Sequence, residues 1–127
     1  MEGERMVPRI LVAEDNEKNL VLMRDVLRYF GYEVLEARNG LECIDMAVEH
    51  CPGLILMDIQ MPVMSGVDAM KRLRMRAETR EIKIVAVTSL AMQGDRERLL
   101  GEGFDDYIQK PMDLVELPDI VKKYLRV

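Results

Sequence analysis

Short apolar runs alternate along the chain with longer segments in which apolar residues return every three or four positions. The short runs are typical of β-strands, and the longer segments have the spacing of one face of an α-helix. Four successive apolar residues lead directly into Asp58, which indicates a strand buried on both faces. The predicted strands cover residues 9–13, 32–37, 54–58, 82–87 and 106–108.

Capping and helix-breaking residues bound the predicted helices. Asp15 or Asn16 can cap the first helix, and Gly31 can end it in a left-handed conformation. Ser65 is a candidate cap of the third helix, and Asp68 follows three residues later in a capping-box pattern. The apolar positions of the first three helices, from which we expect the core-facing side chains, are Leu20, Met23, Leu27 and Phe30; Leu41, Ile44, Ala47 and Val48; and Val67, Met70 and Leu73.

The last two predicted helices have weaker signals. The fourth, roughly residues 93–101, is dense in charge and has few apolar anchors. The last follows the candidate cap Asp113, includes Leu114 and contains Pro118. Because proline inside a helix removes a hydrogen bond and can cost ~3 kcal/mol, we expect a kink or a helix that begins near Leu117.

Strands that alternate with helices through short links predict an α/β fold. The expected architecture is a doubly wound, five-stranded parallel sheet with right-handed crossovers and helices on both faces. The more polar strand at 32–37 is expected near an edge of the sheet. We expect one domain at residues 9–127, preceded by a flexible tail at residues 1–8.

Composition narrows the functional classes. The chain has 127 residues, of which 32% are charged and 49% hydrophobic, the balance of an ordinary globular domain. The net charge of −5 and the lack of an evident basic cluster argue against binding of nucleic acid. No apolar run approaches the ~20 residues of a membrane span, and no signal peptide is evident, so a reducing cytoplasm is the expected location.

Two groups of residues are interpreted as structural. Cys43 and Cys51 lie on one predicted helix, too far apart to form a disulfide, and are expected to be small core residues. Four arginines interleave with apolar residues and resemble the solvated side of a helix, although the stem of one can face inward. They are Arg72, Arg74, Arg76 and Arg80, and the one with the inward stem is Arg74.

Polar residues able to carry chemistry follow four of the predicted strands. Ligands of a parallel sheet bind beyond the carboxyl ends of its strands, so these side chains are expected to converge. Two unit charges about 4 Å apart repel by roughly 4 kcal/mol at an effective dielectric near 20, so clustered carboxylates need a compensating cation. Magnesium binds carboxylates and reaches toward substrate phosphate. The converging residues are Glu14, Asp15, Asp58, Thr88, Ser89 and Lys110.

This set of side chains favours phosphoryl chemistry. Aspartate is a known covalent nucleophile for phosphoryl groups, so a carboxylate such as Asp58 can attack phosphorus. The incoming phosphoryl oxygens then need a cation and a hydroxyl group, which Lys110 and Thr88 supply.

The order and spacing of these residues resemble the receiver domain of two-component response regulators. Asp58 lies 43 residues after Asp15, Thr88 lies 30 after Asp58, and Lys110 lies 22 after Thr88. The resemblance covers about residues 8–126 and implies the flavodoxin-like strand order 2-1-3-4-5. It is carried by Glu14-Asp15-Asn16, Asp58 with Met61-Pro62 and Gly66, Thr88-Ser89, and Lys110-Pro111.

The resemblance implies roles for the acidic residues. Asp58 would accept a phosphoryl group from a kinase phosphohistidine. Asp15, Asp58 and the backbone carbonyl of Gln60 would bind Mg²⁺, and Glu14 would act on the ion through water. A cis peptide bond before Pro111 is also implied.

The resemblance implies roles for four further residues. Lys110 would pair with Asp58 and then with a phosphoryl oxygen. Thr88 would be the switch hydroxyl and Tyr107 the switch aromatic. Ser89 would either donate a hydrogen bond to the phosphoryl group or simply be the small residue that the site requires.

The implied protein is a signalling switch rather than an enzyme, although it assists its own phosphorylation and dephosphorylation. Its partners would be a sensor histidine kinase or histidine phosphotransfer protein and a downstream protein. It would be a stand-alone receiver or one excised from a larger protein such as a hybrid kinase. It would be a monomer, or a phosphorylation-dependent dimer through the fourth helix, fifth strand and last helix.

Three alternatives remain open at this point. An aspartate-based phosphatase or phosphotransferase usually has a second acid two residues after the nucleophile, where this chain has Gln60. A nucleotide or flavin binder would need a glycine-rich first loop, whereas Glu14 and Asp15 would repel phosphates. A degenerate receiver that acts only as a scaffold is disfavoured because every expected acceptor-site residue is present.

Overall fold

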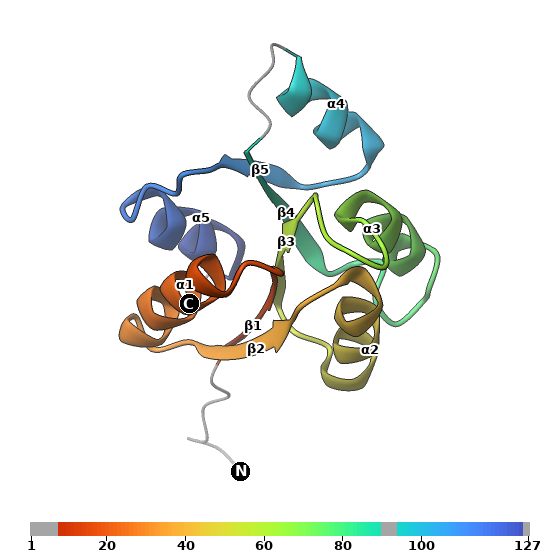
Figure 1. Ribbon diagram of the computed structural model, residues 1–127. Coiled ribbons are helices and arrows are strands. Elements are labelled where there is room, and N and C mark those ends of the chain that lie inside the picture. The colour runs from red at the N-terminus through yellow and green to blue at the C-terminus, as the bar shows by residue number, and fades with distance from the viewer. Residues whose placement is uncertain (1–7, 90–93, 126–127) are drawn as a thin grey trace.

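The computed structural model describes residues 8–89 and 94–125, which form a five-stranded parallel sheet covered by helices on both faces (Figure 1). The strand order is β2-β1-β3-β4-β5, as expected from the sequence. The strands are β1 (Arg9–Ala13), β2 (Glu33–Ala37), β3 (Leu54–Asp58), β4 (Lys83–Thr88) and β5 (Asp106–Gln109).

Burial along the strands follows their place in the sheet. Each residue of β3 is buried, because β1 and β4 flank the strand and helices cover both of its faces. The strand β2 lies at an edge, which confirms the prediction from its polar residues. Successive side chains point to opposite faces, so Leu54 and Leu56 enter one core and Ile55 and Met57 enter the other.

Two layers of helices enclose these two cores. Side chains of α1 and α5 complete one core, and side chains of α2, α3 and α4 complete the other, in agreement with the two layers in Figure 1. The helices are α1 (Glu17–Tyr29), α2 (Gly40–His50), α3 (Gly66–Arg74), α4 (Asp95–Glu102) and α5 (Glu116–Leu125).

The helix boundaries follow the capping residues of the sequence. The side chains of Asn16, Asn39 and Ser65 each accept a hydrogen bond from a backbone N–H in the first turn of α1, α2 and α3. Gly31 has φ of +92°, the left-handed conformation expected after the end of α1. Pro118 lies in the first turn of α5, where a backbone N–H would have no acceptor within the helix, so proline costs no helical hydrogen bond there. The helix begins at Glu116, which confirms the expected start near Leu117.

Several residues expected in the core or in a helix lie elsewhere. Phe30, at the C-cap of α1, and Leu41, in the first turn of α2, are both 45% exposed. Cys43 is buried as expected, but Cys51 is exposed and adopts the left-handed conformation at the C-cap of α2. Leu114 precedes α5 instead of belonging to it and is also exposed.

Two sequence predictions lie wholly or partly outside the described residues. The predicted flexible tail includes residues 1–7, and the expected start of the fourth helix near Gln93 falls in the gap at residues 90–93. Among the residues that the structure describes, no helix has the length and apolar character that crossing a membrane requires.

Candidate functional site

Three carboxylates meet at the carboxyl ends of β1 and β3. Asp58 is the last residue of β3, and Glu14 and Asp15 directly follow β1, its neighbour in the sheet. One carboxylate oxygen of each residue lies within 4.8 Å of the others. The structure therefore brings these three predicted site residues together.

Lys110 brings a positive charge to these carboxylates from the end of β5. Its Nζ atom lies 2.9 Å from Oε1 of Glu14 and 3.3 Å from Oδ2 of Asp58. The backbone N–H of Lys110 donates to the carbonyl of Thr88 at 2.8 Å, which fixes the end of β5 beside β4. The peptide bond between Lys110 and Pro111 is cis, as the resemblance implied.

Glu14, which the resemblance expects to act on the ion through water, is almost fully buried. Its exposed fraction is 1%, compared with 5% for Asp58. One carboxylate oxygen faces Lys110, and the other accepts the backbone N–H of Asn16 at 3.1 Å. In this structure Glu14, and not Asp58, is therefore the nearer carboxylate to the lysine, whereas Asp15 is exposed at the rim.

The crowding of negative charge changes the acidity of Asp58. Burial raises the pKa of its carboxyl to about 7, and the neighbouring Glu14 adds to this rise, while Lys110 and the N–H of Gln60 partly oppose it. Burial lowers the pKa of Lys110, but its bonds and charge interactions with the two carboxylates outweigh that effect and raise it. The lysine is protonated at neutral pH, and Asp58 ionises only at a cost.

The loop after β3 folds closely over the acidic site. The backbone N–H of Gln60 donates to Oδ1 of Asp58 at 3.2 Å, and the N–H of Gly66 donates to the carbonyl of Ile59 at 2.9 Å. A side chain at Gly66 would collide with the backbone of Asp58, so glycine is required for this close approach. Gln60 thus lies at the rim, and the metal-binding role of its carbonyl stays a prediction.

The predicted switch residues lie at the end of β4, the strand beside β3, and on β5, the next strand of the sheet. Thr88 ends β4 and is fully buried, while Ser89 follows it and is exposed. Tyr107 lies opposite Ala86, below the rim, and is partly buried. Burial and the charge of Asp95, at the start of α4, both raise the pKa of the Tyr107 hydroxyl. Thr88 thus ends β4, and Tyr107 lies two residues before the end of β5; the switch roles of both residues stay predictions.

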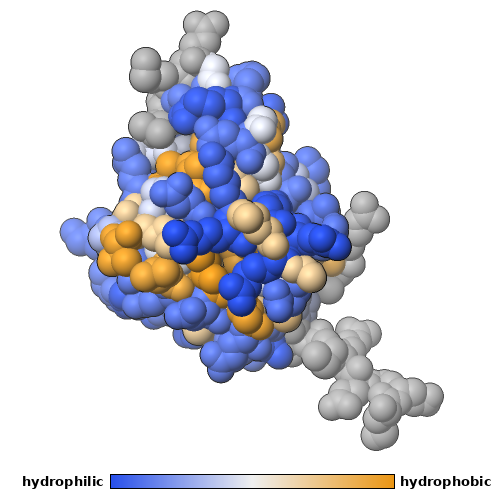
Figure 2. Space-filling view, turned by 90° about the vertical axis from the view of Figure 1, so that its right-hand side faces the viewer, coloured by the Kyte–Doolittle hydropathy of each residue, from blue (hydrophilic) through white to orange (hydrophobic). Residues whose placement is uncertain are grey.

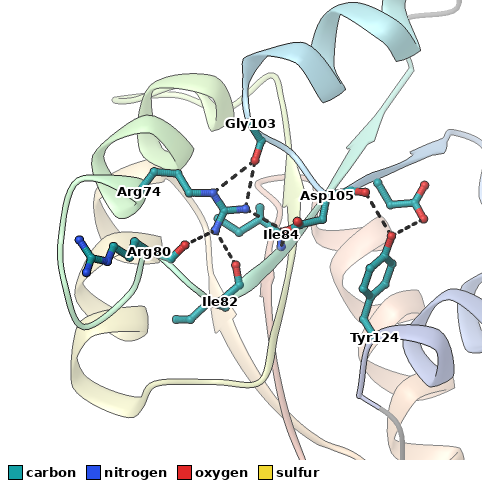
Figure 3. Close-up of polar contacts among 8 residues, drawn as sticks. Arg74, Arg80, Ile82, Ile84, Gly103, Asp105 and Tyr124 are labelled. Carbon is teal, nitrogen blue, oxygen red and sulfur yellow. Dashed lines mark hydrogen bonds and ion pairs between the residues drawn. The ribbon is translucent and has the colours of Figure 1, made fainter.

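A second, partly buried cluster of charged residues was not found from the sequence. Arg74, interpreted there as one of four solvated arginines, turns inward at the end of α3 and pairs with Asp105 at 2.8 Å (Figure 3). The same guanidinium donates to the carbonyls of Arg80, Ile82 and Gly103. The only sequence signal was the position of Arg74 one residue after Leu73, on the inward side of the helix.

The cluster extends across the start of β5 to α5. Oδ2 of Asp105 also accepts the backbone N–H of Ile84 at 2.8 Å. The hydroxyl of Tyr124 donates to the carbonyl of Asp105 at 3.1 Å and to Oδ2 of Asp106 at 2.8 Å (Figure 3). Arg74 and Tyr124 thereby attach α3 and α5 to the same end of β5.

The acidic site fits a divalent cation. Three hard carboxylate donors lie within reach of one another, and one lysine leaves their total charge negative. Magnesium favours oxygen ligands and binds through one or two carboxylates while retaining waters. Asp15 and Asp58 would hold the ion directly. Glu14, which accepts the N–H of Asn16 and forms an ion pair with Lys110, would contribute its charge.

Known proteins share this fold and sequence pattern. The response regulator receiver domain family matches residues 10–122. The polar-differentiation response regulator DivK of Brucella anthropi is 45% identical over 120 residues, covering 94% of this chain and 98% of its own length. DivK of Brucella ovis is 44% identical with the same coverage.

A solved receiver domain with a similar fold contains a bound metal ion. The receiver domain of sensor histidine kinase PA1611 from Pseudomonas aeruginosa superimposes with a TM-score of 0.88 and 34% identity, and the match covers 96% of this chain and 100% of that one. That structure is described with a magnesium ion coordinated in its active-site cleft. The match of sequence, fold and strand order leads to one conclusion: this chain belongs to the response regulator receiver domain family of two-component signalling.

Proposed function

We propose that Asp58 accepts a phosphoryl group from a phosphohistidine and that the modified domain signals to partner proteins. The observation that supports this most directly is the position of Lys110, within 3.3 Å of Asp58 and 2.9 Å of Glu14 at the open end of the sheet. Three carboxylates with a single lysine make an unfavourable structural cluster, so the site needs a function that uses the excess negative charge.

The chemical step is a transfer between two residues. An oxygen of ionised Asp58 attacks phosphorus, and the bond from phosphorus to the histidine nitrogen breaks. That nitrogen takes the electron pair, and the other ring nitrogen keeps its proton, so neutral imidazole leaves. Lys110, already beside Asp58, then pairs with a phosphoryl oxygen. Mg²⁺, when bound at Asp15 and Asp58, would neutralise charge on the carboxylates and the phosphoryl oxygens.

The signal follows from the new charge at the end of β3. A phosphoryl group adds strong acceptor oxygens beside Thr88, whose hydroxyl is drawn toward them. Ser89 is exposed at the same rim and can donate a hydrogen bond in turn. Tyr107, on the adjacent strand, follows the movement of Thr88 and changes the surface formed by α4, β5 and α5.

The upstream partner in this proposal is a sensor histidine kinase or a histidine phosphotransfer protein, and the downstream partner is a protein. The domain is a cytoplasmic monomer that binds no nucleic acid, or a dimer formed through the α4–β5–α5 face after phosphorylation. Its own part in the chemistry is to assist the gain and loss of the phosphoryl group. Light scattering with and without phosphodonor measures the oligomeric state.

The primary test is phosphorylation by a small-molecule phosphodonor. Intact-mass measurement after incubation with acetyl phosphate and Mg²⁺ should show the gain of one phosphoryl group, and peptide mapping should locate it on Asp58. The gain should disappear in Asp58→Asn and in EDTA. Asp45→Asn, which changes an exposed carboxylate on α2, is the matched control and should be phosphorylated normally.

Two results would overturn the proposal. One is a phosphoryl group on another residue while Asp58→Asn is still modified. The other is continuous turnover of a phosphomonoester, which would identify the domain as a hydrolytic enzyme. A further test uses a histidine phosphotransfer protein that carries a labelled phosphoryl group. This protein should transfer the labelled group to the wild-type domain and not to Asp58→Asn.

A further inference from the structure

The segment from Lys71 to Lys83 carries positive charge that the proposed function does not use. It comprises the end of α3, the following loop and the first residue of β4. Six basic and two acidic residues give it a charge of +4 in a chain of −5, so the remainder carries −9. We define the basic patch as the exposed basic residues of this segment together with Met75, namely Lys71, Arg72, Met75, Arg76, Arg80 and Lys83; the two acidic residues, Glu78 and Glu81, are exposed beside them.

The positive charges of this patch are largely uncompensated. Within the described part of the chain, Arg76 has an ion pair with Glu78 at 3.6 Å, and the other four basic residues of the patch have none. Met75 lies among them with 85% of its surface exposed. Figure 2 faces the side that carries α2 and α3 and shows deep blue, hydrophilic residues across its middle with orange residues between them.

The helix dipole accounts for only part of the patch. Basic residues are favoured in the last turn of a helix, which explains Lys71 and Arg72 on α3. The effect falls off within that turn, and Arg76, Arg80 and Lys83 lie beyond it. Their positions therefore have no explanation in the stability of α3.

The loop that presents these charges is held in place from within. Arg74 donates to the carbonyl of Arg80 at 2.9 Å and to that of Ile82 at 2.6 Å (Figure 3). The buried hydroxyl of Thr79 donates to the carbonyl of Leu73 at 2.7 Å. A loop fixed in this way loses little conformational entropy when a partner binds, which is the property of a preorganised docking surface.

The basic patch lies at the opposite end of the sheet from the acidic site. The parallel strands end at the acidic site, and the patch includes Lys83, which begins β4, whereas Thr88 ends it. A partner on the patch would therefore leave Asp58 accessible to a phosphodonor.

We propose that the basic patch docks an acidic segment of a protein partner, one with an apolar side chain between its carboxylates. The carboxylates pair with the unpaired arginines and lysines, and the apolar side chain covers the flexible thioether of Met75. A short peptide fits better than a long polyanion, because nucleic acid or an anionic membrane would also approach the −9 of the rest of the chain. This docking is independent of phosphorylation at Asp58.

Fluorescence anisotropy tests the proposal with a fluorescein-labelled peptide in which glutamates flank a central leucine. The wild-type domain should bind it at low ionic strength, more weakly as salt is raised, and should not bind the matching glutamine peptide. Arg72→Glu with Arg80→Glu should weaken binding by at least about tenfold, and the corresponding glutamine pair by less. Met75→Gln should weaken binding by about threefold, since it removes only the apolar contact.

A matched charge change elsewhere separates docking from general attraction. Arg28→Glu with Lys122→Glu alters two exposed residues on the other face of the sheet by the same net charge and should leave peptide binding within about twofold. Equal weakening by both pairs would overturn the proposal. Tighter binding of the domain to duplex DNA or anionic vesicles than to the peptide would also overturn the proposal. So would self-association of the domain that abolishes peptide binding.

Discussion

Near the start of β5, the partly buried Arg74 and Asp105 form one pair of opposite charges. At the end of β3, the two carboxylates of Asp58 and Glu14 face the single positive charge of Lys110. Asp105 accepts from Arg74 and from the N–H of Ile84, so its charge is well compensated. In the acidic site two enclosed carboxylates share one lysine, and the pKa of Asp58 rises to about 7. The first arrangement is expected to stabilise the fold, whereas the second retains excess negative charge, which the proposed binding of a cation and a phosphoryl group would use.

The largest expected effect is the loss of the compensated cluster. Arg74→Ala should lower the free energy of unfolding by about 3 kcal/mol, because it leaves the partly buried Asp105 without its counter-charge. Urea denaturation followed by circular dichroism measures the change. Arg72→Ala, an exposed neighbour on the same helix, should change stability by less than about 0.5 kcal/mol. Equal effects of the two substitutions would show that the cluster is not a stabilising unit.

The acidic site should respond in the opposite direction. Asp58→Asn in EDTA at about pH 8 should raise the free energy of unfolding by on the order of 2 kcal/mol, because it removes a carboxylate that ionises at a cost. The pKa of Asp58 is higher in the folded state, about 7 instead of 3.8, so the wild type loses stability as pH rises between these values. The advantage of Asp58→Asn should therefore vanish near pH 4.

Urea denaturation of both proteins across this pH range provides the measurement. Asp45→Asn, an exposed aspartate on α2, is the control and should show no such pH dependence. A lower stability of Asp58→Asn than of wild type at high pH would contradict the electrostatic comparison between the two clusters.

A smaller effect is expected from magnesium. At ten times its dissociation constant, Mg²⁺ should stabilise the wild type by about 1.4 kcal/mol, since it binds the folded acidic site and not the unfolded chain. Thermal melts with and without the ion measure this, and Asp58→Asn should respond less because it lacks one ligand. Arg74→Ala should keep the full response, although its starting stability is lower. An equal response of Asp58→Asn and wild type would place the ion elsewhere.

Much of the fold followed from local patterns that tertiary contacts reinforce. The continuous apolar run before Asp58 indicated a strand with both faces covered, and β3 is that strand. Asn16 and Ser65 cap their helices because a side-chain oxygen beside a helix start has unpaired N–H groups within reach. Signals of this kind depend on residues close in sequence, so they can be found without the structure.

The errors arose where burial depends on distant segments. The helical spacing of Phe30 and Cys51 predicted burial. Phe30, at the C-cap of α1, is nevertheless 45% exposed, although Lys122 of α5 lies over its ring, and Cys51, at the C-cap of α2, is exposed. Arg74 was placed on the solvated side of a helix, with only its stem able to face inward, and its charged partner, Asp105, comes 31 residues later. A pattern of neighbouring residues cannot reveal a partner so far away in the sequence.

The acidic site shows the same limit at finer scale. The polar residues at the strand ends could be predicted to converge, because parallel strands end at one edge of the sheet. The division of Lys110 between Glu14 and Asp58 could not, since it depends on side-chain positions of a few tenths of an ångström. The depth of Glu14 and the exposure of Asp15 likewise require coordinates.

The most direct test of the central claim is the titration of Asp58 itself. Carbon-detected NMR of the labelled side-chain carboxyl, assigned by comparison with Asp58→Asn, gives its pKa in EDTA and in Mg²⁺. The account predicts a pKa of about 7 in EDTA, and a lower value when the ion favours the charged form. A pKa in EDTA at or below the ordinary value of about 4 would show that the site holds no uncompensated charge and would contradict the account.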